Sequence, residues 1–140
     1  MDAQALNSYI RQEIRKEVHS DRIELYLPFV FGNGTSDTLC LVWNKDGVLS
    51  DGGRTFKELK KRVGDLTPYS ENIQNILTAH GMVTLESGHI LTVRNFQTCI
   101  CGDDTYTDYM AGLSRLLRVI SQISIVDTIK VDEYGAVYVC

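Results

Sequence analysis

An alternation of apolar residues over positions 22–31 constrains the fold of this 140-residue chain more than any other feature. Every second position carries a large apolar side chain, in the order Ile23, Leu25, Leu27, Phe29 and Phe31. A two-residue period places these side chains on one face of a β-strand, so the sequence predicts a sheet with one buried face. Pro28 has no N–H to donate to a neighbouring strand and therefore favours an edge position.

The remaining strands are expected in pairs, with short turn-forming segments such as 44–47 and Ser87-Gly88 between them. These pairs are 38–43 with 48–50, 82–86 with 89–95 (which 96–102 could extend), and 128–131 with 136–139. The segment 38–43 (TLCLVW) is apolar enough to be covered on both faces. Such closely spaced pairs are typical of antiparallel β-hairpins.

Four segments have the three-to-four-residue apolar spacing of amphipathic helices: 6–18, 55–63, 70–80 and 105–123. Thr55 and Glu58 have the spacing of a capping box, and Ser70 can cap the third helix. We expect Asp51-Gly52-Gly53 to form a sharp turn into the second helix, with Asp51 binding the turn amides. The predicted fold is therefore a single α+β domain over residues 1–140, an antiparallel sheet of hairpins packed against three to four helices.

The composition excludes several classes of protein. Hydrophobic residues make up 44% and charged residues 23% of the chain, which is typical of a folded domain. No apolar run is long enough to span a bilayer, and the first residues have no signal-peptide pattern, so we expect a cytoplasmic protein. Fourteen Lys and Arg against 18 Asp and Glu give a net charge of −4, which disfavours tight, general nucleic-acid binding.

One cysteine pair is a candidate for zinc binding. Cys99 and Cys101 would point to the same side of a strand, as a pair of soft ligands should. Because zinc prefers four nitrogen or sulfur ligands, the site would need two more, for which His80, His89 and Cys140 are the candidates. The alternative interpretation is that these cysteines are free thiols, since the chain has no second closely spaced pair.

Charged and aromatic side chains on two helices are candidates for partner binding. The helix after the Asp-Gly-Gly turn carries a basic face, and the last long helix begins with acids and a tyrosine. The candidate residues are Arg54, Lys57, Lys60, Lys61, Asp103, Asp104 and Tyr106. The alternative for each set is an ordinary solvated helix face. The spacing Asp51…Glu58-x-Lys60 also matches a metal-dependent nuclease pattern, but a helix would point Glu58 and Lys60 apart.

The middle of the chain resembles a known family. Leu27-Pro28-Phe29, a polar hairpin, and then Leu49-Ser50-Asp51-Gly52-Gly53-Arg54-Thr55-Phe56 are similar to the phage, prophage and mobile-element family called domain of unknown function eighteen-twenty-eight. The similarity extends over about residues 21–123. The resemblance implies a small accessory protein and brings no catalytic residues with it.

Composition and resemblance together lead to the following functional expectation. We expect a non-enzymatic protein that binds a host protein, for example a counter-defence inhibitor of a host effector such as a CRISPR nuclease. The alternative is a nucleic-acid-binding or nucleic-acid-processing accessory protein that uses the basic helix face.

Overall fold

The structure is a computed structural model that describes residues 15–30, 36–94, 96 and 105–139, with the backbone alone at 30, 36–37 and 105–110. The fold is α+β, as the sequence predicts. Its elements, in chain order, are β1 (Arg15–Val18), β2 (Arg22–Val30), β3 (Ser36–Asn44), β4 (Leu49–Ser50), α2 (Arg54–Val63), the 3-10 turn η1 (Thr67–Tyr69), α3 (Ser70–His80), β5 (Val83–Glu86), β6 (Ile90–Val93), α4 (Thr105–Ser124), β7 (Ile129–Val131) and β8 (Val137–Val139).

Six strands form one antiparallel sheet in the order β1-β2-β3-β4-β6-β5. The alternation of β2 is confirmed, because Leu25 and Leu27 are buried in the core while Glu24 and Tyr26 point to the other face. In β3 the residues next to them, Leu39 and Leu41, are fully buried. The sheet therefore has one strongly apolar face, which belongs to the core of the molecule.

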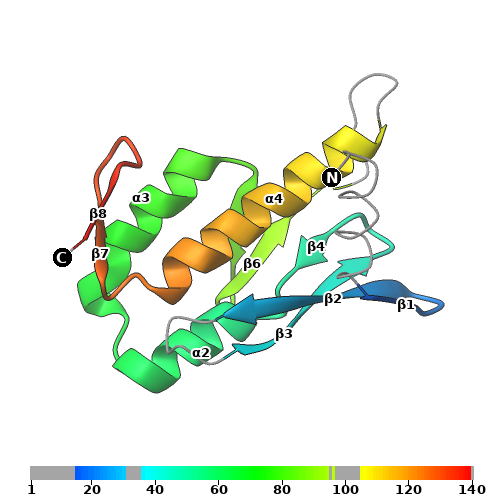
Figure 1. Cartoon of the computed structure of the whole chain (residues 1–140), viewed down its shortest axis with the longest axis horizontal. Coiled ribbons are helices and arrows are strands. Elements are labelled where there is room, and N and C mark those ends of the chain that lie inside the picture. Colours follow the sequence, from blue (N-terminus) through cyan, green and yellow to red (C-terminus); the bar gives the residue numbers. More distant parts are fainter. Residues whose placement is uncertain (1–14, 31–35, 95, 97–104, 140) are drawn as a thin grey trace, which may run out of the picture.

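The helices pack against this apolar face and against one another. Helix α4 contacts α2, α3, β5 and β6, and Figure 1 shows it crossing in front of β6 with α3 beside it. Leu116, Ile120 and Ile123 on α4 have no exposed surface, and they lie in the same core cluster as Phe56 of α2 and Ile76 of α3. No helix in the part of the chain that the structure describes is long and apolar enough to cross a membrane.

The turn before α2 is built around the buried carboxylate of Asp51, as the sequence predicts. Asp51 Oδ1 accepts hydrogen bonds from the backbone N–H of Gly53 (2.9 Å) and of Leu91 (3.0 Å), and Oδ2 accepts one from Thr55 (3.3 Å). Gly52 and Gly53 both have positive φ. The predicted capping box is wrong, because the helix begins at Arg54 and the Asp51 carboxylate reaches its first turn instead of the Thr55 hydroxyl.

Strands β7 and β8 form a separate hairpin that lies against α3 (Figure 1). The side-chain amide of Asn72 donates to Ile129 O (3.2 Å) and accepts from Val131 N (3.0 Å). Asn75 donates to Val131 O at 2.8 Å. Two asparagines of α3 thus provide hydrogen-bond partners for the backbone groups on the edge of β7 that faces away from β8. These bonds attach the hairpin to α3 without a third strand.

The structure corrects several local predictions. Residues 15–18 form strand β1, which pairs with β2, so the predicted helix over 6–18 is wrong in its last turn; its residues 6–14 lie outside the described part. His89 belongs to the β5–β6 turn and not to a strand, since its φ is +58°. Strand β2 is internal in the sheet, between β1 and β3, and not at the edge that Pro28 favours; Pro28 lies opposite Thr38 of β3.

Two further predictions concern how strands are covered and extended. Strand β3 is not fully covered on its second face, where Cys40 and Val42 are half-buried. The possible strand extension over 96–102 falls mostly outside the described residues, and Phe96 itself is not in a strand. The Phe96 ring is buried and meets Trp43 edge-on, with 5.0 Å between the ring centroids.

Candidate functional site

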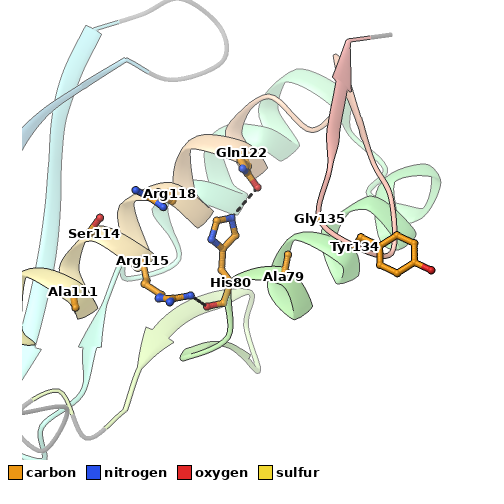
Figure 2. Close-up of a pocket in the computed structure, with 9 residues that line it drawn as sticks. All are labelled: Ala79, His80, Ala111, Ser114, Arg115, Arg118, Gln122, Tyr134 and Gly135. Atoms are coloured by element: carbon orange, nitrogen blue, oxygen red, sulfur yellow. Dashed lines mark hydrogen bonds between the residues drawn. The ribbon is translucent and has the colours of Figure 1, made fainter. Parts of the chain in front are cut away.

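The C-terminal end of α3, the middle of α4 and the tip of the β7–β8 hairpin enclose a groove of about 430 Å³. Its α4 residues lie three or four positions apart, so they share the face of the helix that is turned away from the core. Figure 2 shows the nine residues that line it: Ala79, His80, Ala111, Ser114, Arg115, Arg118, Gln122, Tyr134 and Gly135.

The groove is cationic. Arg115 and Arg118 are exposed and lie one helical turn apart, and none of the nine lining residues is acidic. Arg115 donates to the backbone oxygen of His80, the last residue of α3, where a positive charge also favours the helix dipole. The guanidinium of Arg118 has no hydrogen bond or ion pair with any residue that the structure describes. In a chain of net charge −4, two neighbouring guanidinium groups without a carboxylate favour an anionic partner.

Two close contacts hold the walls of the groove in place. His80 Nε2 lies 3.1 Å from Gln122 Oε1, which connects the end of α3 to α4 (Figure 2). At the other wall Gly135 approaches α3 so closely that a Cβ on it would lie 2.5 Å from the Cβ of Ala79. Gly135 also has φ +83°, a conformation that side-chain-bearing residues rarely adopt. The hairpin tip therefore has a fixed position beside Ala79, at the end of the groove opposite the arginines (Figure 2).

The hairpin extends the groove with exposed apolar and aromatic side chains, which we call the hairpin surface: Tyr134, Val137, Tyr138 and Val139. Tyr134 at the groove is 86% exposed, and Val139 is 90% exposed. Among the described strands, β8 pairs only with β7, so the other edge of β8 has no strand beside it. Tyrosine and arginine are the residues that most often carry binding energy at protein interfaces.

The predicted basic face of α2 is partly satisfied within the chain. Arg54 and Lys61 both bind the carboxylate of Glu58, at 3.0 and 3.5 Å. Lys60 Nζ lies 2.8 Å from His89 Nδ1. Only Lys57 among the four predicted residues has no partner in the described part of the chain. Because three of the four cations have internal partners, this face offers less unpaired charge than the groove.

The other predicted partner-binding residues are not tested by the structure. Asp103 and Asp104 lie outside the described residues. Tyr106 falls within the first turn of α4, but its side chain is not described. Their role in partner binding stays a prediction.

The two histidines of the predicted zinc site have different neighbours. His80 contacts Gln122 across the groove, whereas the His89 ring stacks on Phe56, with 5.1 Å between the ring centroids. Neither belongs to a cluster of three metal-ligating groups among the described residues. Cys99, Cys101 and Cys140 lie outside the described residues, so zinc binding at this site stays a prediction.

The nuclease pattern does not form a metal site in the described residues. Asp51 is 2% exposed, and both of its carboxylate oxygens accept hydrogen bonds from backbone N–H groups. Glu58 binds Arg54 and Lys61. These contacts give Asp51 and Glu58 separate structural roles.

Sequence reasoning missed Arg115, Arg118 and Tyr134. The spacing of α4 identifies both arginines as polar-face residues, but it cannot show that the end of α3 and the hairpin tip line the same groove. One sequence signal could have found this site. Exposed helix faces commonly alternate positive and negative side chains, whereas Arg115 and Arg118 lie one turn apart with no acidic residue one turn away from either.

The fold and the groove together define an α+β protein with a cationic groove next to an exposed aromatic hairpin. Comparisons with protein-family models, with curated proteins and with solved structures find no match for the chain.

Proposed function

We propose that the chain is a protein-binding module, and that its groove and hairpin surface receive an acidic segment of a partner protein. The observation that carries this proposal is that Arg115 and Arg118 line the same groove as the exposed Tyr134, without a carboxylate in the groove lining. Guanidinium groups bind carboxylates through paired hydrogen bonds, and tyrosine supplies rigid contact area with a polar tip.

A nucleic acid is the second candidate partner, because phosphates also bind arginine. Two observations favour protein. The groove offers two arginines, whereas duplex binding needs a longer row of phosphate contacts. The exposed valines of β8 have no counterpart to bind on a phosphate backbone, but they suit an apolar protein surface.

The origin of the partner follows from the resemblance and stays a prediction. An accessory protein of a phage or mobile element would meet host proteins, and a counter-defence inhibitor would bind a host effector such as a CRISPR nuclease. Under this proposal binding itself produces the effect, so one protein molecule acts on one partner molecule.

Affinity capture with charge-reversal variants tests the proposal. The wild-type chain and the Arg115→Glu/Arg118→Glu variant are each used to capture proteins from host lysate, and a protein retained by the wild type is then purified and titrated. We expect the double variant to weaken that complex at least about 10-fold, because a hydrogen bond to a charged group contributes about 1.5–3 kcal/mol. Lys45→Glu/Lys57→Glu is the matched control, since it reverses two exposed lysines outside the groove and the hairpin surface.

Two results would overturn the proposal. The first is a complex that survives reversal of both arginines but is lost in the lysine control. The second is tight binding of a labelled single-stranded oligonucleotide. If the wild-type chain binds this oligonucleotide with higher affinity than it binds the captured partner protein, and if salt releases it, the nucleic-acid candidate is favoured.

A further inference from the structure

We propose that the β1–β2 hairpin carries a metal site, in which Glu17, His19 and Glu24 bind one divalent transition-metal ion such as Zn²⁺. The three side chains come from β1, from the turn and from β2. They share no residue with the groove or with the predicted cysteine site.

The strand geometry brings the three ligands together. Glu17 lies directly opposite Glu24 in the β1–β2 register, and His19 is the first residue after β1, in the turn that joins the two strands. One nitrogen or oxygen from each residue lies within 4.8 Å of the others. Two ligand atoms of a tetrahedral zinc ion are about 1.6 bond lengths apart, which is about 3.3–3.6 Å for bonds of about 2.0–2.2 Å. Side-chain movements of up to about 1.5 Å are therefore needed to close the site.

A second set of side chains orients Glu24. Its Oε2 accepts hydrogen bonds from the Tyr26 hydroxyl and from the Cys40 thiol, whose sulfur lies 3.7 Å away. The other oxygen of the carboxylate, Oε1, lies 2.7 Å from His19 Nε2. The Tyr26 hydroxyl also lies 3.4 Å from Glu17 Oε2, so it bridges the two carboxylates. Partners of this kind commonly fix the ligands of metal sites in place.

The ligand types indicate the class of ion. One imidazole with two carboxylates suits Zn²⁺ and its first-row neighbours. Magnesium and calcium prefer ligand sets made only of oxygen, so the histidine disfavours them. The site lies on the sheet face that points away from the core, where His19 is 37% exposed and an ion can enter from solvent.

Arg22 is the internal competitor of the ion. Two carboxylates directly opposite each other on neighbouring strands repel, and a cation must compensate them. In the structure Arg22 does so in part, with its guanidinium 3.1 Å from Glu24 Oε1. The same guanidinium also lies 3.0 Å from Asp21, so it keeps an acidic partner when it leaves Glu24 to the ion. Glu17 forms no ion pair with Arg22 in the described structure, so Arg22 compensates only one of the two carboxylates.

Calorimetric titration of the full chain with Zn²⁺ tests the site, with Co²⁺ absorption as a second readout of the ligands. We expect one equivalent to bind, and His19→Gln and Glu24→Gln each to weaken binding at least about 10-fold, since losing even an outer-sphere partner costs about 10–100-fold. Arg22→Gln should strengthen binding, because it removes the competing cation. His80→Gln in a Cys99→Ser/Cys101→Ser background is the matched histidine control and should bind like that background.

A Cys99→Ser/Cys101→Ser variant separates this site from the cysteine site, and it should keep the titrated equivalent. The proposal is overturned if zinc does not bind in excess, if the two ligand variants bind as tightly as the wild type, or if the cysteine variant alone abolishes binding. Weaker binding by Arg22→Gln would also overturn it, and that readout does not depend on the stability of the ligand variants.

Discussion

At the scale of single residues, the carboxylate of Asp51 connects a helix to the sheet. One carboxylate binds three backbone N–H groups, two at the start of α2 and one, that of Leu91, in β6. The side chain therefore joins the helix to the sheet at the point where the chain turns from one to the other. It is 2% exposed, so water cannot replace the bonds it makes.

Replacing Asp51 with Asn should destabilise the fold. The amide keeps one acceptor oxygen for three N–H groups, so at least one buried donor loses its partner. We expect the free energy of unfolding to fall by about 1.5–3 kcal/mol, the usual contribution of a hydrogen bond to a charged group. Urea unfolding measures it. Asp46→Asn, in the exposed turn between β3 and β4, is the control and should change stability by less than about 0.5 kcal/mol. Equal effects of the two substitutions would contradict the role of Asp51.

Gly135 gives a second prediction at this scale. An alanine there must adopt φ +83° and also place its Cβ 2.5 Å from the Cβ of Ala79. Gly64 has a similar φ of +75° but open space around it, so Gly64→Ala measures the conformational cost alone, about 1–2 kcal/mol. We expect Gly135→Ala to cost about 1–3 kcal/mol more, the usual range for overpacking. Hydrogen exchange should show the loss in β7 and β8, and identical losses for both variants would refute the close contact.

At the scale of elements, the end of α2 is joined to the segment after α4. Arg62 donates to both oxygens of Asp127 and also to the backbone oxygen of Ser124, at 2.6 Å. The hydrogen bond from Arg62 holds the pKa of the Asp127 carboxyl below its ordinary value of 3.8. A group whose pKa is lowered by folding stabilises the fold above its unfolded pKa and loses that contribution as the pH falls.

The pH dependence of Asp127→Asn should therefore differ from that of the wild type. The wild type should be more stable than the variant at pH 7 and pH 5, and this difference should shrink as the pH falls below about 4, because the wild-type carboxyl then takes up a proton. Urea unfolding of both proteins across this range measures it. A difference that is constant down to pH 2, or that grows on acidification, would contradict the assignment.

The attachment of the β7–β8 hairpin to α3 depends on two side-chain amides. Asn72→Ala should leave Val131 N and Ile129 O without their partner, so we expect faster hydrogen exchange throughout β7 and β8. Exchange in β2 and β3 should not change, because the hairpin is a separate sheet. Gln74→Ala, on the exposed side of α3, is the control. Equal protection of the hairpin in both variants would show that the asparagine bonds contribute little.

Local sequence patterns predicted most helices and strands. The predictions failed where contacts between residues far apart in the chain determine the local conformation. The α+β class, α2, α3, α4 and the closing hairpin follow from local periodicity. Residues 15–18 read as helix because Val18 continues a four-residue spacing, but pairing with β2 decided their conformation. Local spacing also predicted that Thr55 caps the helix, whereas the side chain that accepts hydrogen bonds from the first turn is Asp51, four residues earlier. The groove could not be predicted, since it needs the mutual positions of three elements.

At the scale of the whole molecule, the two proposed sites are built from different elements. The groove uses α3, α4 and the β7–β8 hairpin, and the metal cluster uses β1, β2 and the turn between them. Substitutions at separate sites without shared partners usually act additively. We therefore expect His19→Gln to leave the affinity for the protein partner unchanged, with or without zinc, as measured by titration of the captured protein. A zinc-dependent affinity would instead reveal coupling between the two regions.

The edge of β8 that pairs with none of the described strands also affects how the protein behaves in concentrated solution. Val137, Tyr138 and Val139 follow one another on this edge, and no lysine, proline or glycine interrupts them. An unprotected edge is a template on which a second copy can add a strand, and that copy exposes the same edge again. Monomeric protein should thus persist at low concentration and give way to higher assemblies as concentration rises. A bound partner would occupy the template, so the complex should stay soluble where the isolated chain precipitates.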